Sequence, residues 1–428
     1  MDKDMQIENN DAKRNASRGL ELVNCPAART RQLADLSEEL IMEILLRLPT
    51  RRLVYLRRVC RSWRNLISSP DFTRNHLHRS CSCDPSLTPL RIAHYPHNGW
   101  NREIKFFSVQ SMLDNPSEPT KAARFSEGGY YRIVGSCHGL LCFFGSYANH
   151  DMHAILWNPC TGFIFESPEI SGEACFSGFG YDHLSDTYKF YATIIRKKMP
   201  YGVESSARIY TFGPTSSWRR IDDIPSSLLS APKQQPWNKV DNKIGVFFNS
   251  SKACTINWDA YNVIVYFDMG IETYGHFPLP DRELDELSTC ANLCVLRNCL
   301  SVCYEHMKTQ SWIVWQMKEY GEAQSWNKLV TIPFHPRVRY LNRALTLQPL
   351  YISESDVLLA ISPFFTIVLC NLNDGNINFT VNDISGEVDC KMAFIYHQSL
   401  VSPNGLQRNS SKMPLYFYIA KPSFSFSR

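Results

Sequence analysis

Hydrophobic residues near the N-terminus follow the period of an α-helix. Between Ser37 and Leu48 they recur at steps of three and four residues, which places them on one side of a helix. Ser37 can cap this helix, and Pro49 ends it, because proline lacks a backbone N–H and restricts the residue before it. Apolar residues recur at helical steps again after Pro49, with Leu53, Leu56 and Val59 and then with Trp63, Leu66 and Ile67. We therefore predict three helices, over about 37–48, 51–60 and 61–68.

Beyond residue 90 the pattern changes to short apolar runs separated by Gly, Asn, Asp and Ser, which is typical of strands and turns. Hairpin-like pairs between the main runs give about four strands to each repeat. Six runs recur at spacings of 50, 53, 56, 49 and 54 residues, anchored at Phe107, Trp157, Tyr210, Tyr266, Trp315 and Leu369. Repeated four-stranded units of this length predict a kelch-like β-propeller with six blades. A β-sandwich of ordinary size would use roughly a third of these strands.

One internal match supports the repeat. The stretch "SWRRIDDIP" at 217–225 shares Ser-Trp, a basic residue, an aliphatic residue and Ile-Pro with "SWNKLVTIP" at 325–333. The two stretches lie 108 residues apart, which is two periods of 54. The fold class expected for the whole chain is therefore α+β and multidomain, with N-terminal helices followed by an all-β propeller.

Composition places the chain among folded globular proteins. Hydrophobic residues make up 44% and charged residues 20% of the 428 positions, and the formal net charge is +4. So small a charge does not by itself indicate nucleic acid or a membrane surface as a partner. The N-terminus is polar and no apolar run reaches membrane-spanning length, so we expect a location in the cytoplasm or nucleus. The 15 cysteines are then expected to be free thiols.

Two stretches invite a chemical interpretation, and each has a simpler structural one. A metal site could use His76, His78, Cys81 and Cys83 in "NHLHRSCSC", but this spacing matches no familiar zinc pattern. In "SCHGLL", His138 could activate a neighbouring Cys or Ser, yet adjacent strand residues point to opposite faces, and a hairpin turn at Gly139 explains the sequence better. We expect no metal, no cofactor and no catalysis by this chain.

The helical segment fits a protein-binding role, and its arginines, which could suggest nucleic acid, are not accompanied by a recognition-helix pattern. About 45 residues is near the lower limit for independent folding, so part of the apolar surface must meet a partner. The segment resembles an F-box, in the plant form that ends in "VCRSWRNLISSPDF". This resemblance implies docking on a Skp-type adaptor and, through it, on a cullin scaffold. The family usually has proline where this chain has Ser37, so we expect a modest loss of adaptor binding. The residues implied for adaptor contact or for packing beneath it are Leu36, Leu40, Ile41, Ile44, Leu45, Leu48, Pro49, Val59, Cys60, Trp63, Leu66 and Ile67.

The strand-rich remainder is similar to the F-box-associated domain of plant F-box proteins. The matching stretches include "SCHGLLCFF", "LWNPCTG", "GFGYD", "IYTF" and the terminal "IYHQSLVSP". This resemblance implies a substrate receptor of an SCF-type ubiquitin ligase, whose propeller loops capture a protein for ubiquitination and degradation. Relatives include S-locus receptors of S-ribonucleases and receptors that turn over immune proteins, and both targets stay open. A basic target could contact the acidic loop "DRELDE" through Asp281, Glu283, Asp285 and Glu286.

The expected domain organisation follows from these two resemblances. We expect a disordered polar tail over 1–32, the F-box over 33–80, a linker over 81–90, the propeller over 91–420 and a C-terminal tail over 421–428. The alternative from a different class is a propeller enzyme or lectin-like module whose N-terminal helices serve only for packing. Binding to a purified Skp-type adaptor separates the two hypotheses.

Overall fold

A computed structural model gives the fold of the chain. It describes residues 36–82, 87–96, 103–116, 121–126, 130–146, 151–198, 202–213, 217–225, 246–247, 252–257, 263–280, 291–306, 308–334, 347–362, 366–381 and 390–403. The predicted tails at 1–32 and 421–428 lie outside these residues. The chain divides into two compact units, Met1–Leu45 and Leu46–Arg428.

The described part of the first unit consists of helix α2 (Glu38–Leu46), which includes the first residue of the second unit at its end. Ser37 caps the helix as predicted: the Leu40 N–H donates to Ser37 Oγ at 3.4 Å, and the Ile41 N–H donates to the Ser37 carbonyl at 3.0 Å. Two glutamates occupy the first turn, where the helix dipole favours negative charge. Serine therefore starts this helix without the proline that is usual in the F-box.

Three more helices begin the second unit: α3 (Thr50–Leu56), α4 (Arg61–Ser68) and α5 (Pro70–Ser82). The first two match the predicted helices, whereas α5 was not predicted. It starts with Ser69, whose Oγ accepts the Phe72 N–H at 3.2 Å, and with Pro70 in the first turn. Proline at a first helical position is a start signal, because its missing N–H would have no partner there in any case. Pro70 therefore opens a helix. In the part of the chain that the structure describes, no helix is both long enough and apolar enough to cross a bilayer.

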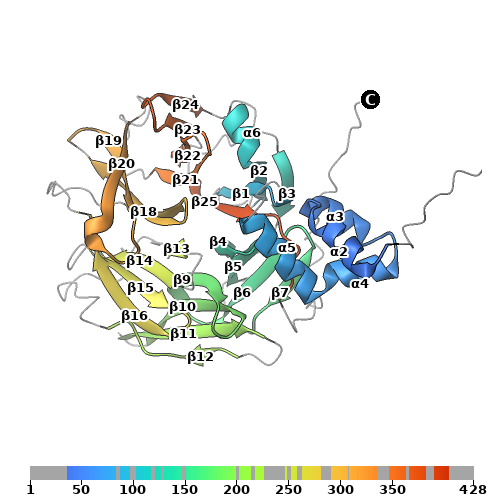
Figure 1. The fold of residues 1–428 in the computed structure, drawn as a ribbon. Coiled ribbons are helices and arrows are strands. Elements are labelled where there is room, and N and C mark those ends of the chain that lie inside the picture. The colour runs from blue at the N-terminus through green and yellow to red at the C-terminus, as the bar shows by residue number, and fades with distance from the viewer. Residues whose placement is uncertain are drawn as a thin grey trace, which may run out of the picture. The chain divides into compact units, whose positions relative to one another are not determined.

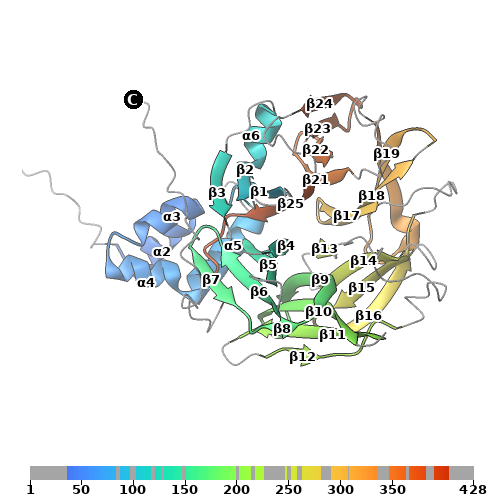
Figure 2. The same cartoon turned by 180° about the vertical axis from the view of Figure 1, so that it is seen from behind.

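The rest of the second unit is a ring of antiparallel sheets. Within the described residues the strands form six sheets of four strands each, with one extra short strand, β8, paired to β6. Figures 1 and 2 show these sheets around a common centre, with β25, β4, β9, β13, β17 and β21 innermost. The predicted six-bladed propeller is confirmed.

The first three blades run as follows from the inner to the outer strand. Blade 1 holds β25 (Cys390–His397), β1 (Leu90–Pro96), β2 (Glu103–Ser108) and β3 (Lys121–Ser126), with helix α6 (Val109–Asp114) after β2. Blade 2 holds β4 (Tyr130–Cys137), β5 (Leu140–Ser146), β6 (Asp151–Asn158) and β7 (Phe163–Glu166), with β8 (Ile170–Ser171) beside β6. Blade 3 holds β9 (Glu173–Asp182), β10 (Thr187–Lys198), β11 (Gly202–Phe212) and β12 (Arg219–Arg220).

The last three blades keep the same order. Blade 4 holds β13 (Val246–Phe247), β14 (Lys252–Asn257), β15 (Val263–Asp268) and β16 (Thr273–Pro278). Blade 5 holds β17 (Ala291–Leu296), β18 (Cys299–His306), β19 (Ser311–Met317) and β20 (Trp326–Pro333), with the 3-10 helix η5 (Ala323–Ser325) before β20. Blade 6 holds β21 (Gln348–Ile352), β22 (Val357–Ser362), β23 (Thr366–Asn371) and β24 (Ile377–Val381).

The repeat seen in the sequence corresponds to equivalent positions in the blades. All six predicted anchor runs are third strands, β2, β6, β11, β15, β19 and β23. The matched Ser-Trp stretches open the outer strands of blades 3 and 5. There Trp218 Nε1 donates to the Pro168 carbonyl at 2.7 Å, and Trp326 Nε1 donates to the Pro278 carbonyl at 3.2 Å. Each indole thus binds the end of the preceding blade, so the internal match preserves a contact between blades.

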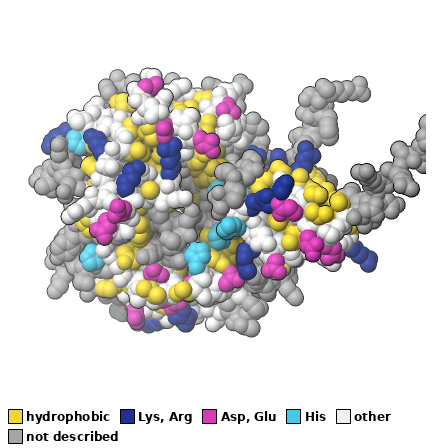
Figure 3. All heavy atoms as spheres, in the orientation of Figure 1, with side chains coloured by type: hydrophobic (Ala, Val, Ile, Leu, Met, Phe, Trp, Pro, Cys, Tyr) yellow, Lys and Arg dark blue, Asp and Glu magenta, His cyan; other side chains and the backbone are white. Residues whose placement is uncertain are grey.

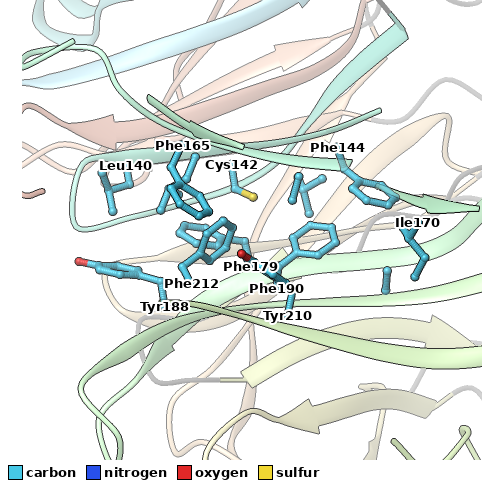
Figure 4. Packing of buried hydrophobic residues seen from close by; sticks show 14 of the residues in the cluster. Leu140, Cys142, Phe144, Phe165, Ile170, Phe179, Tyr188, Phe190, Tyr210 and Phe212 are labelled. Atoms are coloured by element: carbon cyan, nitrogen blue, oxygen red, sulfur yellow. The ribbon is translucent and has the colours of Figure 1, made fainter. Parts of the chain in front are cut away.

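The hydrophobic core lies between neighbouring blades. Each adjacent pair of blades shares one cluster of buried residues among those described. The cluster between blades 2 and 3 is rich in aromatic rings, and Phe144 and Phe190 lie 4.8 Å apart between ring centroids (Figure 4). Because each sheet covers the apolar face of the next, a single blade could not bury its own surface.

The ring closes where the last strand returns to the first blade. β25 pairs with β1, and the chain after β25 is held by buried Asn158, whose Nδ2 donates to the Ser399 carbonyl at 3.1 Å and to the Val401 carbonyl at 2.7 Å. The β4–β5 turn meets the same segment. Its Gly139 has φ +80°, and a Cβ there would lie 2.3 Å from Ser399 Oγ. The predicted hairpin turn at Gly139 is confirmed, and it also packs against the closure.

We expect Gly139→Ala to lower the free energy of unfolding by about 2–5 kcal/mol. The left-handed backbone costs alanine about 1–2 kcal/mol, and the crowding against Ser399 adds about 1–3 kcal/mol. Gly375→Ala is the matched control, because Gly375 has φ +71° and nothing lies within 4 Å of its added Cβ. Urea denaturation of both variants measures the difference. Equal losses in the two variants would contradict the close contact at the ring closure.

Candidate partner-binding surfaces

Helix α2 carries an exposed apolar stripe. Leu36, Leu40 and Ile44 are spaced by four residues and are 38%, 53% and 50% exposed. Leu40 and Ile44 lie one turn apart along one side of α2, and Leu36 precedes the first residue of the helix. The other side of the helix is buried, since Leu45 is 1% exposed. Large apolar side chains left half exposed in a row mark a surface for a partner.

Helix α3 has a comparable division in the second unit. Its inner side is buried, with Thr50 and Leu53 both 0% exposed, and Thr50 Oγ1 donates to the Gln398 carbonyl at 3.1 Å. Its outer side leaves Tyr55 53% exposed and Val59, in the turn that follows, 64% exposed. Figure 3 shows hydrophobic, basic and acidic side chains exposed over the helices. We call the outer side of residues 51–61 the α3 face.

The structure sorts the predicted adaptor residues by exposure. Leu36, Leu40, Ile44, Val59 and Cys60 are exposed. Ile41, Leu48, Pro49, Trp63 and Leu66 are partly buried. Leu45 and Ile67 are fully buried, at 1% and 0% exposure. Leu45 is buried in this structure, and its predicted contact with a partner stays a prediction. Sequence reasoning missed Tyr55, which stands among arginines on the polar side of the helical pattern.

Trp63 is less buried than a core residue. Trp63 is partly buried, and its backbone N–H donates to Sγ of Cys60 at 3.4 Å, so Cys60 caps the start of α4. A loss of about 3–5 kcal/mol on replacement by alanine applies to a fully buried aromatic. Trp63→Ala is therefore expected to lower the free energy of unfolding by less than this.

We expect Ser37→Ala to destabilise α2 by about 1 kcal/mol, because the Leu40 N–H loses its side-chain acceptor. Binding of an adaptor to the α2 stripe should weaken by less than about ten-fold, since the variant changes only the cost of ordering the helix. Ser68→Ala is the control, because Ser68 is also exposed but is the last residue of α4 and does not cap a helix start. Titration calorimetry with the adaptor measures both. Complete loss of binding in Ser37→Ala alone would show that Ser37 itself contacts the partner.

The propeller presents two edges. In blades 2 to 6 the turn from the first to the second strand and the turn from the third to the fourth lie at one edge, which we call the proximal edge. In blade 1 the end of β25 and the start of β1 lie at this edge. Neighbouring turns contact each other there, as Arg297 does with Asp356 at 2.7 Å. Helices α3 and α5 contact this edge through Thr50 and through the 2.9 Å ion pair of Arg74 with Asp186. The strand ends at the opposite, distal edge point away from these helices.

The acidic target-binding residues of the sequence analysis lie outside the described residues. Asp281, Glu283, Asp285 and Glu286 belong to the connection from β16 to β17. β16 ends and β17 begins at the distal edge. The structure therefore gives the edge from which this connection departs.

The candidate chemical residues have structural roles in the described part of the chain. His138 Nδ1 lies 3.0 Å from the Tyr188 hydroxyl, and burial, with a smaller effect from His183, lowers the pKa of His138 to about 4. Ser136 Oγ donates to the Ile395 carbonyl at 2.6 Å, away from the histidine ring. The neutral His138, in the β4–β5 turn, therefore contacts the Tyr188 hydroxyl, while Ser136 binds a backbone carbonyl.

Of the four possible zinc ligands, the structure describes the side chains of His76 and His78. His76 Nε2 lies 2.9 Å from the Leu48 carbonyl and is buried, whereas His78 is exposed. The side chain of Cys81 and all of Cys83 lie outside the described residues. Among the described residues, no group of three or more His, Cys, Asp or Glu side chains could hold a metal ion.

A buried ion network joins blades 3 and 4 at the proximal edge. Lys189 Nζ lies 2.9 Å from Asp182 Oδ2 and 3.1 Å from Glu272 Oε1, and Arg219 binds Glu272 from outside. Burial alone would raise the pKa of Asp182, but hydrogen bonds from Ser185 and Lys189 hold it below its usual value. Every charge in this network has a partner, so it serves to join the blades.

Comparisons with known proteins agree with this architecture. A family model described as F-box domain matches residues 33–75, and one described as F-box associated beta propeller domain matches residues 100–402. The F-box/kelch-repeat protein At3g23880 of Arabidopsis thaliana is 31% identical, over 87% of this chain and 97% of its own length. The F-box protein CPR1 of the same plant is 26% identical, over 70% of this chain and 73% of its own.

Similar solved structures are distant in sequence. TolB of Acinetobacter baumannii has a TM-score of 0.41 and 9% identity, over 77% of this chain and 73% of that one. A six-bladed fucose-binding lectin of Aleuria aurantia has a TM-score of 0.36 and 8% identity, over 70% of this chain and 96% of that one. The family matches span both the helical segment and the propeller. The chain belongs to the F-box proteins that carry an F-box-associated β-propeller domain.

Proposed function

We propose that this protein is a substrate receptor of an SCF-type ubiquitin ligase. Helix α2 binds a Skp-type adaptor through its exposed stripe, and the adaptor links the chain to a cullin scaffold. The observation that supports this most strongly is the stripe of Leu36, Leu40 and Ile44 in an F-box match, about half exposed in the free chain. An apolar surface of this kind gains free energy when a partner removes it from water.

The propeller holds the target in this proposal. Helices α3 and α5 contact its proximal edge, so a target at the distal edge would leave these helices free. Connections at this edge include 226–245, 281–290 and 335–346, and long connections on a rigid scaffold commonly carry binding residues. The contact of a basic target, such as a ribonuclease, with Asp281, Glu283, Asp285 and Glu286 belongs to this proposal, and an immune receptor is the alternative target.

The chain contributes position and no chemistry of its own. Holding a target beside a loaded conjugating enzyme raises the effective concentration of its lysines. Two features of the described residues support a non-catalytic role: His138 is neutral and packed against Tyr188, and the ion network of Lys189 is fully paired. We propose that it acts in the cytoplasm or nucleus, where the ligase components occur.

Reconstitution tests the proposal. The full chain is mixed with a plant Skp-type adaptor, cullin and RING subunit, and the mixture is passed over a size-exclusion column. We expect one stoichiometric complex and, after ubiquitin-activating and conjugating enzymes are added, ubiquitin on lysines of the chain itself. If the folded full chain elutes apart from the adaptor, the receptor proposal is wrong and a packing role for α2 takes its place.

A further inference from the structure

The large apolar side chains that the propeller exposes lie at its proximal edge. Among the described residues of the propeller, Leu184, Ile271 and Tyr320 are 77%, 65% and 42% exposed. They stand in the β9–β10, β15–β16 and β19–β20 turns, which are all proximal turns. A single exposed apolar side chain needs no explanation, but several at one edge indicate a contact surface.

Leu184 and Ile271 come from neighbouring blades and belong to one patch. Leu184 Cδ1 lies 3.2 Å from the position that a Cβ would take on Gly270, the residue before Ile271. The two turns are therefore in contact, and both of their large apolar side chains are open to water. We call Leu184 and Ile271 the blade 3–4 patch.

The turns that carry the patch are held in place by hydrogen bonds. Asp182 Oδ1 accepts the Leu184 N–H at 2.8 Å in one turn. Asp268 Oδ1 accepts the Gly270 N–H at 2.9 Å in the other. Lys189 joins the two turns, because its Nζ binds Asp182 on one side and a backbone carbonyl of the second turn on the other. The patch is therefore ordered before anything binds to it, which lowers the cost of binding.

The described chain ends near this patch. Ser399 Oγ, after the last strand, donates to the His138 carbonyl at 2.6 Å. The His138 ring lies 4.8 Å from the Tyr181 ring between centroids, and Tyr181 is near the end of β9, next to the turn that carries Leu184. The described residues end at Pro403, four positions after Ser399. The residues that follow, which we call the C-terminal segment, therefore continue from a part of the chain beside blade 3.

The C-terminal segment contains an apolar stretch within reach of the patch. Residues 413–420 read "MPLYFYIA", with aromatic rings at Tyr416, Phe417 and Tyr418. Chains that stay open to water are usually poor in aromatic and branched residues, so this stretch is expected to be covered. The nine residues at 404–412 can span about 30 Å when extended. Neighbouring sheets pack about 10 Å apart, so this length is enough to reach blade 4.

Charge favours a contact within the chain. The C-terminal segment, residues 404–428, has four basic residues and no acidic one. Residues 71–403, which include most of α5 and the propeller, contain 32 acidic and 28 basic residues. At the proximal edge itself, Glu319 and Glu322 are exposed near Tyr320. Opposite charges thus draw the segment toward the surface that carries the patch.

We propose that residues 413–420 bind the blade 3–4 patch of the same chain. Their aromatic side chains cover Leu184 and Ile271, while residues 404–412 run along the proximal edge from the ring closure. A short tether gives a segment an effective concentration of about a millimolar, so it outcompetes a second copy of the chain in dilute solution. The C-terminal segment thereby joins the ring closure to blades 3 and 4. This contact involves neither an adaptor nor a target, so it is independent of the proposed function.

Photo-crosslinking in the full chain tests this contact. Ile271 is replaced by p-benzoylphenylalanine, which keeps the patch apolar and forms a covalent bond with neighbouring C–H groups under ultraviolet light. We expect crosslinks from position 271 to residues 413–420 within one chain. Mass spectrometry of the digested monomer identifies the crosslinked residues.

Matched variants show which residues make the contact. Tyr416→Ser, Phe417→Ser, Tyr418→Ser removes the rings of the apolar stretch and should lower the crosslinking yield about ten-fold. Phe424→Ser with Phe426→Ser removes rings of the same segment outside this stretch and should keep most of the yield. p-Benzoylphenylalanine in place of Thr331, an exposed position of β20 toward the distal edge, should give no crosslink to residues 413–420. Circular dichroism confirms that each variant is folded.

Each of four results would overturn the inference. Crosslinked dimers would assign the patch to a second copy of the chain. Crosslinks from position 271 that reach only residues outside 404–428 would assign it to another part of the same chain. The absence of any crosslink would show that the patch is open in solution. An equal yield with and without the three aromatic rings would show that these rings do not hold the contact.

Discussion

Replacing Leu40 and Ile44 together by aspartate is expected to abolish binding of the adaptor, with a loss of affinity of about 100-fold or more. Both side chains are about half exposed on α2, so they are available to a partner. Truncating one central apolar contact of an interface typically costs about 2 kcal/mol, and a carboxylate adds the cost of burying a charge. Titration calorimetry with a purified Skp-type adaptor measures the change.

The double substitution should leave the fold intact, because both side chains are exposed. Aspartate is only modestly less favourable than leucine within a helix, by roughly 0.7 kcal/mol or less at each position. The thermal transition of the propeller should therefore match that of wild type.

The control for this variant is Leu184→Asp with Ile271→Asp. These side chains are 77% and 65% exposed on the propeller, and the substitutions change the net charge by the same amount. They should leave adaptor binding unchanged. A comparable loss of binding in both double variants would mean that added negative charge, and not the α2 stripe, decides the affinity.

Replacing Lys189 by methionine is expected to lower the free energy of unfolding by about 3–5 kcal/mol, because a buried carboxylate then loses its cation. Lys189 and Asp182 are 8% and 2% exposed in their side chains, and Lys189 Nζ also donates to the Met269 carbonyl of blade 4 at 2.8 Å. Lys328→Met removes an exposed lysine of blade 5 and should cost little. Urea denaturation followed by fluorescence compares the two.

The same network predicts a dependence on pH. The pKa values of Asp182 and Glu272 are held below their usual range, because hydrogen bonds and cations outweigh the effect of burial. Their contribution is therefore present above the pKa of the unfolded chain and is lost as the pH falls through the folded value. Between neutral pH and about pH 3, wild type should lose more stability than Lys189→Met. An equal loss in both proteins would show that Lys189 does not lower these pKa values.

The sequence could predict those parts of the fold that depend on local periodicity. Helix α2 follows from its apolar spacing and from Ser37, and the six anchor runs are all third strands that pack between blades. The match of Trp218 with Trp326 also has a structural cause, since both indoles bind a carbonyl of the preceding blade. Residues in equivalent positions of the blades have equivalent neighbours. The structural repeat therefore appears as a repeat in the amino-acid sequence.

Other features depend on contacts between distant residues, and the sequence does not show them. The closure of blade 1 by β25 joins residues about 300 positions apart, and nothing local specifies that pairing. Lys189 stands in an ordinary strand pattern, and only the neighbouring blade gives it Glu272. Leu45 shares the apolar period of Leu40, so periodicity alone could not tell the buried side chain from the exposed one. Pro70 could end a helix or begin one. It begins α5, because Ser69 caps the start of that helix by accepting the Phe72 N–H.

Hydrogen–deuterium exchange of the full chain, with and without the adaptor, tests the central claim most directly. The account predicts slower exchange on adaptor binding in residues 38–46 and 51–61, while the distal strand ends of the propeller stay unchanged. Protection that falls on the propeller and leaves 38–46 as in the free chain would contradict it.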